Sequence, residues 1–322
     1  MYQSSLSCAS AVDYPEPHAE RRRSILRQHP ELRHLAGPEP VTGLVILAVV
    51  GIQSAIAIAL ADMRWWVIPI VAFLFGAFAN LACWALIHEG AHNLVARTSR
   101  ANRWWSMIAN LPILVPAAAT FRTFHRHHHR QQGDRWFDAD LPLPEEVRIV
   151  GGSPWRKALW LMLFMPLQVV RASRLPHIRI GGAATNLNIA VVALYAALIF
   201  GAGGLGSLIY LLLSSWLAMG FHPLGARWIQ EHHLLSGAQE TTSYYGPANW
   251  LVMNCGYHTE HHDLPGIAWL HLPRVRRIAA DHYDGLHACR SWSALLWRFL
   301  TDRKLTLGAR VVRESPPPAS RS

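Results

Sequence analysis

Charged residues are scarce in this 322-residue chain. Asp, Glu, Lys and Arg together make up 16% of the sequence, whereas they make up roughly 25% of an ordinary soluble domain. Hydrophobic residues account for 51%, and 14 residues are tryptophan. The shortage of charge therefore argues against a soluble globular domain and favours a membrane protein.

Cysteine is also scarce, and its spacing excludes two kinds of small domain. The four cysteines are Cys8, Cys83, Cys255 and Cys289. They form no paired spacing, so the sequence predicts neither a disulfide framework nor a zinc ribbon. The opening residues MYQSSLSCAS contain no apolar stretch of the kind found in a cleavable signal peptide, and position 2 is not the glycine that N-myristoylation requires.

Lysine is nearly absent, since only Lys157 and Lys304 occur among the 30 basic residues. The net charge of +10 is therefore carried by arginine. A basic chain raises the alternative of nucleic-acid binding, but the sequence contains no RNA- or DNA-binding motif. The arginines lie instead beside apolar segments, a charge pattern typical of the regions that flank membrane spans.

Four apolar segments each approach the roughly 20 residues that cross a bilayer as a helix. They are residues 43–61, 66–87, 185–204 and 205–222. Only DMRW separates the first two, and only the glycine-rich GAGGLG lies between the last two. Each pair is therefore predicted to form a helical hairpin that returns to the side it left.

Arginines predict the orientation of these hairpins. Five arginines precede the first segment and three follow the second, whereas the short turns hold only Asp62 and Arg64. By the positive-inside rule, the bulk of the chain is expected to be cytoplasmic. Two shorter apolar stretches that contain proline, 104–119 and 158–170, are expected to be interfacial or re-entrant helices.

Histidine is abundant, and most of it is clustered close to the predicted spans. HEGAH at 88–92 follows the second span, and its two histidines share one helix face because they are four residues apart. FRTFHRHHHR at 121–130 and GYHTEHHD at 256–263 both contain the spacing H-x-x-H-H. Read in this common register, His127 falls at the position of Glu260, so we expect His127 not to be a ligand.

The hairpin topology predicts that all three histidine clusters lie on one side of the membrane. Eight imidazoles can then converge, whereas a single zinc ion needs about four ligands. Eight or nine nitrogen donors suit two metal ions with open positions, and imidazole is compatible with iron. A solvated or helix-end histidine would explain one of these residues, but not a spacing that recurs at distant positions.

One competing interpretation rests on HEGAH alone. The motif matches H-E-x-x-H, the zinc metalloprotease signature in which the glutamate is the general base. Such a site needs only one further ligand, so it would leave most of the other clustered histidines without a role. A membrane zinc metalloprotease is kept as a remote alternative.

Further stretches give the sequence a resemblance to a known family. They are PHAERRRSILRQHPELRHL at 17–35, NLP at 110–112, GFHPLGARWIQEHH at 220–233, TTSYYGPANWLVMNCGYHTEHHDLPGI at 241–267 and RRIAADHYDGL at 276–286. Together with the three histidine boxes, these stretches resemble the membrane fatty-acid desaturase and hydroxylase superfamily, and within it the sphingolipid (dihydroceramide) Δ4-desaturases. The resemblance covers about residues 17–300.

This resemblance implies a non-haem diiron site held by the box histidines and by one more ligand from the segment after the fourth span. For that ligand we expect His232, which follows Glu231, with His222 in GFHP as the alternative. The expected ligands are His88, His92, His125, His128, His129, His232, His258, His261 and His262.

The sequence also departs from the pattern that the resemblance leads us to expect. Arg227 stands where we expect histidine, and His233 and Thr242 stand where we expect tyrosines. These changes leave the expected ligands intact. They leave open which lipid is the substrate and where the double bond is placed.

Four carboxylates lie beside expected ligands in the sequence: Glu89, Glu231, Glu260 and Asp263. Each is a candidate to hydrogen-bond an imidazole and fix its tautomer. The alternative for each of them is an ordinary surface carboxylate.

The expected function is the desaturation of a ceramide-like (dihydroceramide, Δ4) or other long-chain acyl lipid, with O2 as co-substrate and two iron ions as cofactor. Sphingolipid C4-hydroxylation and general acyl-lipid desaturation at the same site are the alternatives. Because the sequence contains no haem domain or cysteine cluster, we expect an external electron donor of the cytochrome b5 or ferredoxin type. Arg274, Arg276 and Arg277 are candidates to dock an acidic donor or to bind lipid headgroups.

The expected fold is an all-α integral membrane protein with about four transmembrane helices in two hairpins, interfacial helices and a cytoplasmic histidine-rich diiron domain. Residues 1–42 form the expected cytoplasmic N-terminal segment, and 43–300 form the desaturase domain. Residues 301–322 form a tail whose end, RESPPPASRS, is predicted to be disordered. The membrane would be the inner membrane of a bacterium, or the endoplasmic reticulum of a eukaryote.

Overall fold

Three stretches form helices that are long and apolar enough to cross a membrane: Val41–Ala59, Val67–Ala91 and Ala183–His232. They occur in a computed structural model that describes residues 10–175 and 177–316. Large apolar side chains remain exposed on these helices, among them Leu44 at 69% and Leu198 at 63%. Such surfaces are stable against lipid tails and not against water. The elements of the three stretches are α2 (Val41–Ala59), α3 (Val67–Val71), the π-helix η2 (Ala72–Gly76), α4 (Ala77–Ala91) and α10 (Ala183–Met219), which α11 (Arg227–His232) follows.

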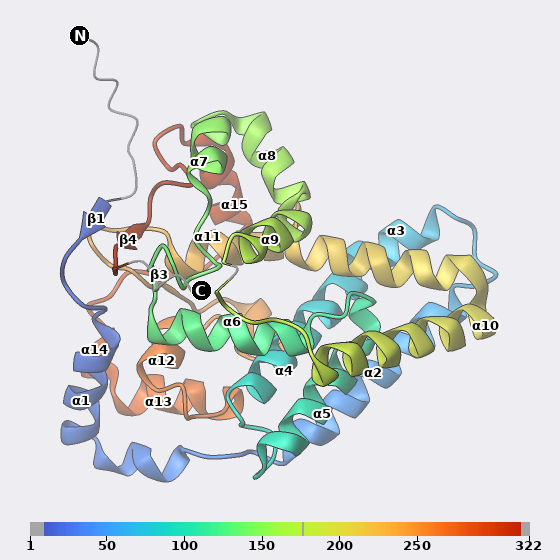
Figure 1. The fold of residues 1–322 in the computed structure, drawn as a ribbon, viewed down its shortest axis with the longest axis horizontal. Coiled ribbons are helices and arrows are strands. Elements are labelled where there is room, and N and C mark those ends of the chain that lie inside the picture. Colours follow the sequence, from blue (N-terminus) through green and yellow to red (C-terminus); the bar gives the residue numbers. More distant parts are fainter. Residues whose placement is uncertain (1–9, 176, 317–322) are drawn as a thin grey trace.

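The chain reverses direction inside α10. Gly204 has φ 65° and ψ −162°, in contrast to the helical residues on either side, and this backbone region is accessible essentially only to glycine. The two arms of α10 run out to the tip of the molecule and back, beside α2 and α3 (Figure 1). The predicted GAGGLG turn is therefore tighter than expected, since one glycine makes the reversal and the helix continues on both sides of it.

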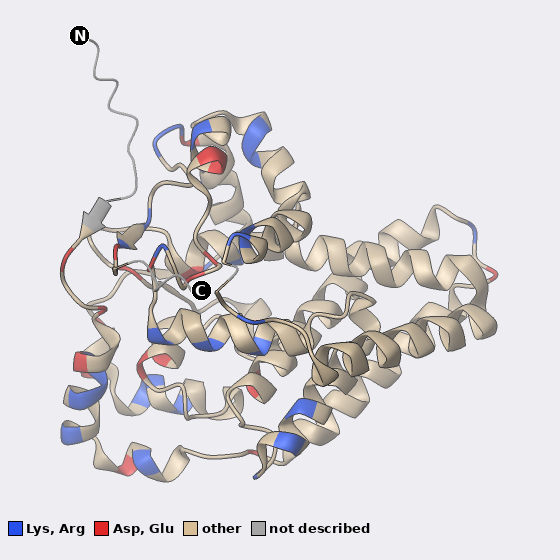
Figure 2. Ribbon diagram, in the orientation of Figure 1, with Lys and Arg blue, Asp and Glu red and all other residues tan. Residues whose placement is uncertain are grey.

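Charge is confined to the ends of these long helices. The arms of the two hairpins are uncharged along most of their length, and the few charged residues at their far end lie in the loop between α2 and α3 (Figure 2). This distribution fits helices that are surrounded by hydrocarbon, where an ionised side chain is costly.

Polar side chains connect three of the long helices within the apolar bundle. Gln53 of α2 donates to Asn80 of α4 at 2.8 Å, and Asn80 donates to Ser215 of α10 at 2.7 Å. Tyr210 of α10 donates to Gln53 at 2.9 Å. All four side chains are buried, so the network fixes the mutual rotation of helices that apolar packing alone would leave loosely specified.

The stretches expected to be interfacial or re-entrant form short helices. The first gives α5 (Ser99–Ala109), the 3-10 helix η3 (Leu111–Ile113) and then α6 (Ala118–Arg130), with a bend of 114° between them. The second gives α8 (Pro154–Met162) and α9 (Phe164–Ser173). None of these helices taken singly is among the candidate spans of the described chain.

The remaining elements are short and gather at the end of the molecule opposite the hairpin tips (Figure 1). Two small parallel sheets pair β1 with β4 and β2 with β3. The helices are α1 (His18–Gln28), η1 (Pro30–Leu35), α7 (Pro144–Val150), η4 (Pro223–Ala226), η5 (Pro247–Val252), α12 (His258–Asp263), η6 (Trp269–His271), α13 (Leu272–Ile278), α14 (Ala280–Tyr283) and α15 (Trp292–Thr301), and the strands are β1 (Ser10–Val12), β2 (Ser243–Tyr244), β3 (Ala288–Cys289) and β4 (Val311–Arg313).

The C-terminal tail is more ordered than the sequence predicts. Arg313, the first residue of RESPPPASRS, ends strand β4 and forms an ion pair of 2.7 Å with Glu240. Ser315 hydrogen-bonds to Asp134. Within this tail, Arg313 and Ser315 therefore have buried polar partners, whereas residues 317–322 lie outside the described chain. Cys8 also lies outside it, and Cys83, Cys255 and Cys289 are free thiols.

The reversal at Gly204 gives a direct test of the hairpin. Gly204→Ala should lower the melting temperature in detergent by roughly 2–10 °C, because a Cβ at this φ and ψ costs about 1–3 kcal/mol. Gly201→Ala is the matched control, since a Cβ at either position meets no atom within 4 Å and only Gly204 has a positive φ. Equal melting temperatures for the two variants would contradict the reversal at Gly204.

Candidate metal centre

Four elements bring the clustered histidines together. HEGAH closes α4, FRTFHRHHHR forms most of α6, and HTEHHD is the whole of α12, while His232 ends α11. Histidines that are far apart in the sequence therefore become neighbours.

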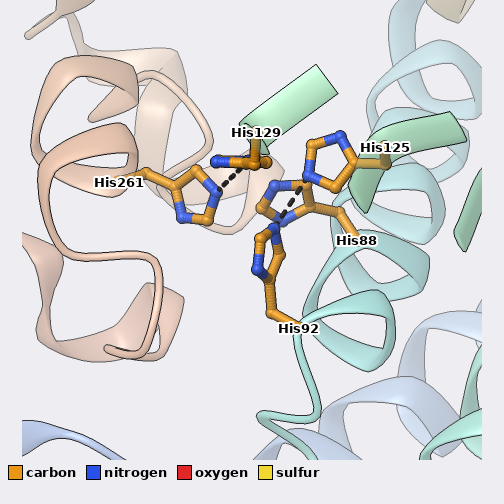
Figure 3. Close-up of side chains that lie close together, drawn as sticks. All are labelled: His88, His92, His125, His129 and His261. Carbon is orange, nitrogen blue, oxygen red and sulfur yellow. Dashed lines mark hydrogen bonds between the residues drawn. The ribbon is translucent and has the colours of Figure 1, made fainter. Parts of the chain in front are cut away.

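Five of these histidines form one group. A ligand nitrogen from each lies within 4.8 Å of a ligand nitrogen from every other member. Imidazoles from α4, α6 and α12 point toward one another in Figure 3. The members of this first group are His88, His92, His125, His129 and His261.

The other expected ligands form a second group beside the first. His128, His232 and His262 satisfy the same distance criterion. His258 adjoins them, because its Nε2 lies 2.9 Å from Nε2 of His232 and its ring centre lies 4.5 Å from that of His262. All nine expected ligands are thus gathered in two adjacent groups.

The spacing between the imidazoles suits metal coordination. Nε2 of His92 lies 2.8 Å from Nε2 of His125, and Nε2 of His261 lies 3.1 Å from Nε2 of His129. Two ligands at right angles around a metal with bonds of about 2.0–2.1 Å would be separated by about 2.9 Å. In addition, Nε2 of His262 is buried and has no hydrogen-bond partner among the described residues. The donor set therefore fits two metal ions.

Burial keeps the third-box histidines in the state that a metal requires. The pKa of His258, His261 and His262 is held well below its ordinary value, first by burial and then by neighbouring imidazoles or other positive groups. A neutral imidazole is the form that ligates a metal ion.

Asp138 is a site residue that the sequence analysis missed. Its Oδ1 lies 3.0 Å from Nδ1 of His128, and it also accepts hydrogen bonds from the backbone N–H groups of Gly133 and Asp140. Burial alone would raise the pKa of Asp138, but the charges and hydrogen bonds of His128, Arg310 and Gly133 lower it to about 2. This carboxylate can fix the tautomer that leaves Nε2 of His128 free. The available signal was the acidic run DRWFDAD directly after the second box.

The four carboxylates named from the sequence have different surroundings. Glu89 and Glu231 approach ligand imidazoles, with 3.5 Å to Nδ1 of His88 and 3.7 Å to Nδ1 of His258. Glu260 instead accepts hydrogen bonds from the hydroxyls of Ser243 and Tyr245, both at 2.5 Å. Asp263 contacts the N-terminal helix α1.

Helix α1 is held against α12 by polar contacts to Asp263, which is fully buried. Nδ1 of His18 lies 2.7 Å from Asp263, and Nε of Arg21 lies 3.0 Å from it. Nε of Arg22 donates to the backbone carbonyl of Asp263 at 2.6 Å. The N-terminal segment therefore holds the last turn of the helix that carries the third box, a role that the sequence analysis did not assign to it.

Several residues considered in the sequence analysis lie outside the two histidine groups. His222 packs its ring on Phe73, and its Nδ1 accepts a hydrogen bond from the N–H of Leu224. His127 stacks on Phe137, away from the group members. His233 and Thr242 are buried, and neither belongs to a histidine group.

Not all of the arginines that were candidates to dock an electron donor or to bind lipid headgroups are free to do so. Arg276 is held by Asp284 at 2.5 Å and by the hydroxyl of Tyr245 at 3.0 Å. It therefore belongs to the internal packing around Glu260, to which its guanidinium also lies close.

A cavity of about 460 Å³ adjoins both histidine groups. Most of its wall is apolar, including Trp84, Phe121 and Phe164, and members of both groups line it. The wall also contains a buried ion pair, in which Nη1 of Arg227 lies 2.5 Å from Oε1 of Glu231. The cavity thus offers a largely apolar surface together with a few polar side chains, among them Arg227 and Glu231 close to the histidines.

The sequence matches known proteins over nearly its whole length. A model of the fatty acid desaturase family matches residues 63–292, and a model described as sphingolipid Delta4-desaturase matches residues 12–41. A rice protein named sphingolipid delta(4)-desaturase DES1-like is 39% identical over 302 residues, which cover 94% of this chain and 91% of the rice protein. The human sphingolipid delta(4)-desaturase/C4-monooxygenase DES2 is 37% identical over 303 residues, which cover 92% of each chain. The Drosophila melanogaster sphingolipid delta(4)-desaturase DES1 is also 37% identical, over 92% of this chain and 93% of the fly protein.

His127 and His129 form a matched pair for testing which histidines of the second box are ligands, because His129 belongs to the first group and His127 belongs to neither group. If each group holds one iron ion, His129→Gln should lower bound iron from about two ions per chain to about one or less, because it removes a donor from the first group. His127→Gln should leave iron content within error of the parent. Iron per chain is measured by elemental mass spectrometry after purification, and melting temperature checks folding. Loss of iron in the His127 variant, or one zinc in place of iron in the parent, would contradict the assignment.

Proposed function

The chain belongs to the fatty acid desaturase family and groups with its sphingolipid Δ4-desaturases, and we propose that it introduces a double bond into a ceramide-like lipid. It is a lipid desaturase and an oxidoreductase by this membership. The observation that carries the substrate proposal is that two histidine groups line one largely apolar cavity, with the Arg227–Glu231 pair beside them. The zinc protease interpretation does not fit, because the two histidines of HEGAH share their group with three others.

We assign the nine histidines to two iron ions. One ion would be held by the first group, and the other by His128, His232, His258 and His262. The distances between their nitrogens and the burial of the rings support this assignment. Asp138 then orients His128, and Glu231 approaches Nδ1 of His258.

The chemistry requires such a centre. When bound, the two irons would supply an oxidant derived from O2, which no side-chain acid or base can replace in removing hydrogen from two adjacent CH2 groups. The balanced reaction converts –CH2–CH2–, O2, two electrons and two protons into –CH=CH– and two waters. The described residues contribute the shape of the cavity, whose aromatic walls hold the alkyl chain and exclude water from the reacting carbons.

The polar pair in the cavity wall supports a substrate that reacts near its polar end. In a ceramide-like lipid, C4 is bonded to the hydroxyl-bearing C3, so the wall close to the metals must accommodate polar atoms. Arg227 and Glu231 provide such a wall, because Glu231 directly precedes His232 in the chain and lies close to His258. Nε of Arg227 is buried without a hydrogen-bond partner among the described residues, so it remains free to donate to a substrate hydroxyl or carbonyl.

C4-hydroxylation is the second candidate function. The human relative carries both activities in its name, sphingolipid delta(4)-desaturase/C4-monooxygenase. Desaturation and hydroxylation begin with the same hydrogen abstraction and differ in whether a second hydrogen is removed or a hydroxyl is added. General acyl-lipid desaturation is less well supported, because it would not require a polar pair at the reacting carbons.

For the membrane arrangement, we propose four spans in two hairpins, with α10 providing two of them on either side of Gly204. The histidine groups would face the cytoplasm, in the inner membrane of a bacterium or the endoplasmic reticulum of a eukaryote. The arginines that flank α2 and α4 support this orientation. Electrons would come from a separate donor of the cytochrome b5 or ferredoxin type.

Lipid mass spectrometry tests the proposed reaction. The full chain would be expressed in a host with a known sphingolipid pool and no Δ4-desaturase of its own. Ceramide-like lipids should lose two hydrogens, and His261→Ala, which still inserts into the membrane, should abolish the change. Gain of one oxygen without desaturation would identify a hydroxylase. An unchanged lipid pool in cells that contain the folded, iron-loaded protein would overturn the proposal.

The contribution of the polar pair is tested with Arg227→Met combined with Glu231→Gln, because removing only the arginine would leave a buried carboxylate unpaired. We expect kcat/KM for a dihydroceramide to fall by about 10–100-fold, because the variant loses one or two hydrogen bonds from a charged donor to the substrate. Turnover of an acyl lipid without the hydroxylated end should change much less. Equal losses for both substrates would show that the pair acts on folding or on metal binding.

A further inference from the structure

A second pocket, of about 360 Å³, lies between α5, α6 and the start of α10. None of the described residues that line it is acidic. Five arginines line it: Arg103 from α5, Arg122, Arg126 and Arg130 from α6, and Arg179 from the segment before α10.

The positive charge in this pocket is uncompensated. Within 10–175 and 177–316, no carboxylate forms an ion pair with Arg103, Arg126, Arg130 or Arg179. Arg122 is the best fixed of the five, but its partners are neutral: the carbonyl of Gly90 and the side chains of Asn93 and Ser99. Elsewhere in the fold, guanidinium groups such as that of Arg171 are paired with a carboxylate.

The arginines are close enough to affect one another. Burial lowers the pKa of Arg122, and the positive charges of Arg126 and Arg103 lower it further. Arg122, Arg126 and Arg130 recur every four residues along α6 and therefore share one face. Like charges gathered in a hollow repel each other unless an anion binds between them.

The pocket lies at the level where lipid headgroups would lie. Gly181, Ala184 and Thr185 line it, and the last two belong to the first turn of α10, a candidate membrane span. On the neighbouring helix α5, Trp104 is 43% exposed, and tryptophan is enriched at the membrane–water interface.

We propose that this arginine pocket binds the phosphate of an anionic membrane phospholipid. Guanidinium groups bind phosphate oxygens through paired hydrogen bonds, and a hollow of this size accommodates one headgroup. A protein partner would be recognised through a larger surface than this recess offers. The inference is independent of the reaction catalysed.

A lipid bound here would lie beside the substrate cavity. Thr120 and Ile180 line both hollows. The same helix α6 also carries His125, His128 and His129. A phosphate bound by its arginines would therefore hold in place, at the membrane surface, the helix that supplies three expected ligands. Anionic lipid would thereby stabilise the fold as well as bind to it.

The test uses the full chain purified in detergent and titrated with dioctanoyl phosphatidylglycerol or dioctanoyl phosphatidylcholine, with binding followed by thermophoresis. The anionic lipid should bind at least about tenfold more tightly than the zwitterionic one and should raise the melting temperature. The variant Arg103→Gln/Arg126→Gln/Arg179→Gln should lose at least about tenfold in affinity for phosphatidylglycerol.

The matched control removes the same charge from exposed arginines on the other side of the fold, as Arg290→Gln/Arg298→Gln/Arg303→Gln, and should bind phosphatidylglycerol like the parent. If the triple pocket variant does not fold, Arg126→Gln alone should still weaken binding by about fivefold. Equal affinities for the two lipids, or full competition by inorganic phosphate at the same concentration, would overturn the proposal. Unchanged lipid binding in the pocket variant, with loss of binding to an acidic ferredoxin or cytochrome b5-type protein, would reassign the pocket to electron-donor docking.

Discussion

The packing of nine imidazoles against one another is the interaction on which the rest of the structure depends. Buried and half-buried rings whose nitrogens face each other at 2.8–3.1 Å are unfavourable as a purely protein core, because polar groups lose water without gaining enough hydrogen bonds. Such an arrangement becomes stable when a metal cation binds between the imidazole nitrogens that face one another. The protein therefore needs rigid surroundings that keep these rings converged.

Those surroundings come from two directions. From the membrane side, the contacts among Gln53, Asn80 and Ser215 fix α4 against α2 and α10, and α4 carries the first box at its end. From the other side, α1 holds α12 through Asp263. The two histidine groups thus lie where a hydrophobic bundle meets a polar layer, which also places them at the depth from which a lipid tail can enter the cavity.

The fold keeps paired charges near the histidine groups apart from the unpaired arginines of the second pocket. Near the histidine groups, charged side chains have partners of opposite sign, as with Arg227 and Glu231 or Asp138 and His128. On the outer face of α6, arginines accumulate without carboxylates. A single helix therefore carries both the second histidine box and a row of arginines that have no carboxylate partner among the described residues.

Local sequence patterns predict the long apolar segments and the three histidine boxes, because hydropathy and histidine spacing are properties of the chain that survive in any fold. The family and the choice of His232 came from the resemblance of longer stretches. The sequence predicted Asp263 as a partner of an imidazole in the third box, but the fold pairs this carboxylate with His18, 245 residues away in the chain. Asp138, the tight reversal at Gly204 and the order of Arg313 also escaped prediction.

Long-range contacts decide how the nine histidines divide into groups, which carboxylate meets which ring, and where the substrate cavity and the arginine pocket lie. Each of these depends on which distant helices come into contact. The spacing of residues along one helix specifies a shared face, but it does not specify what that face meets.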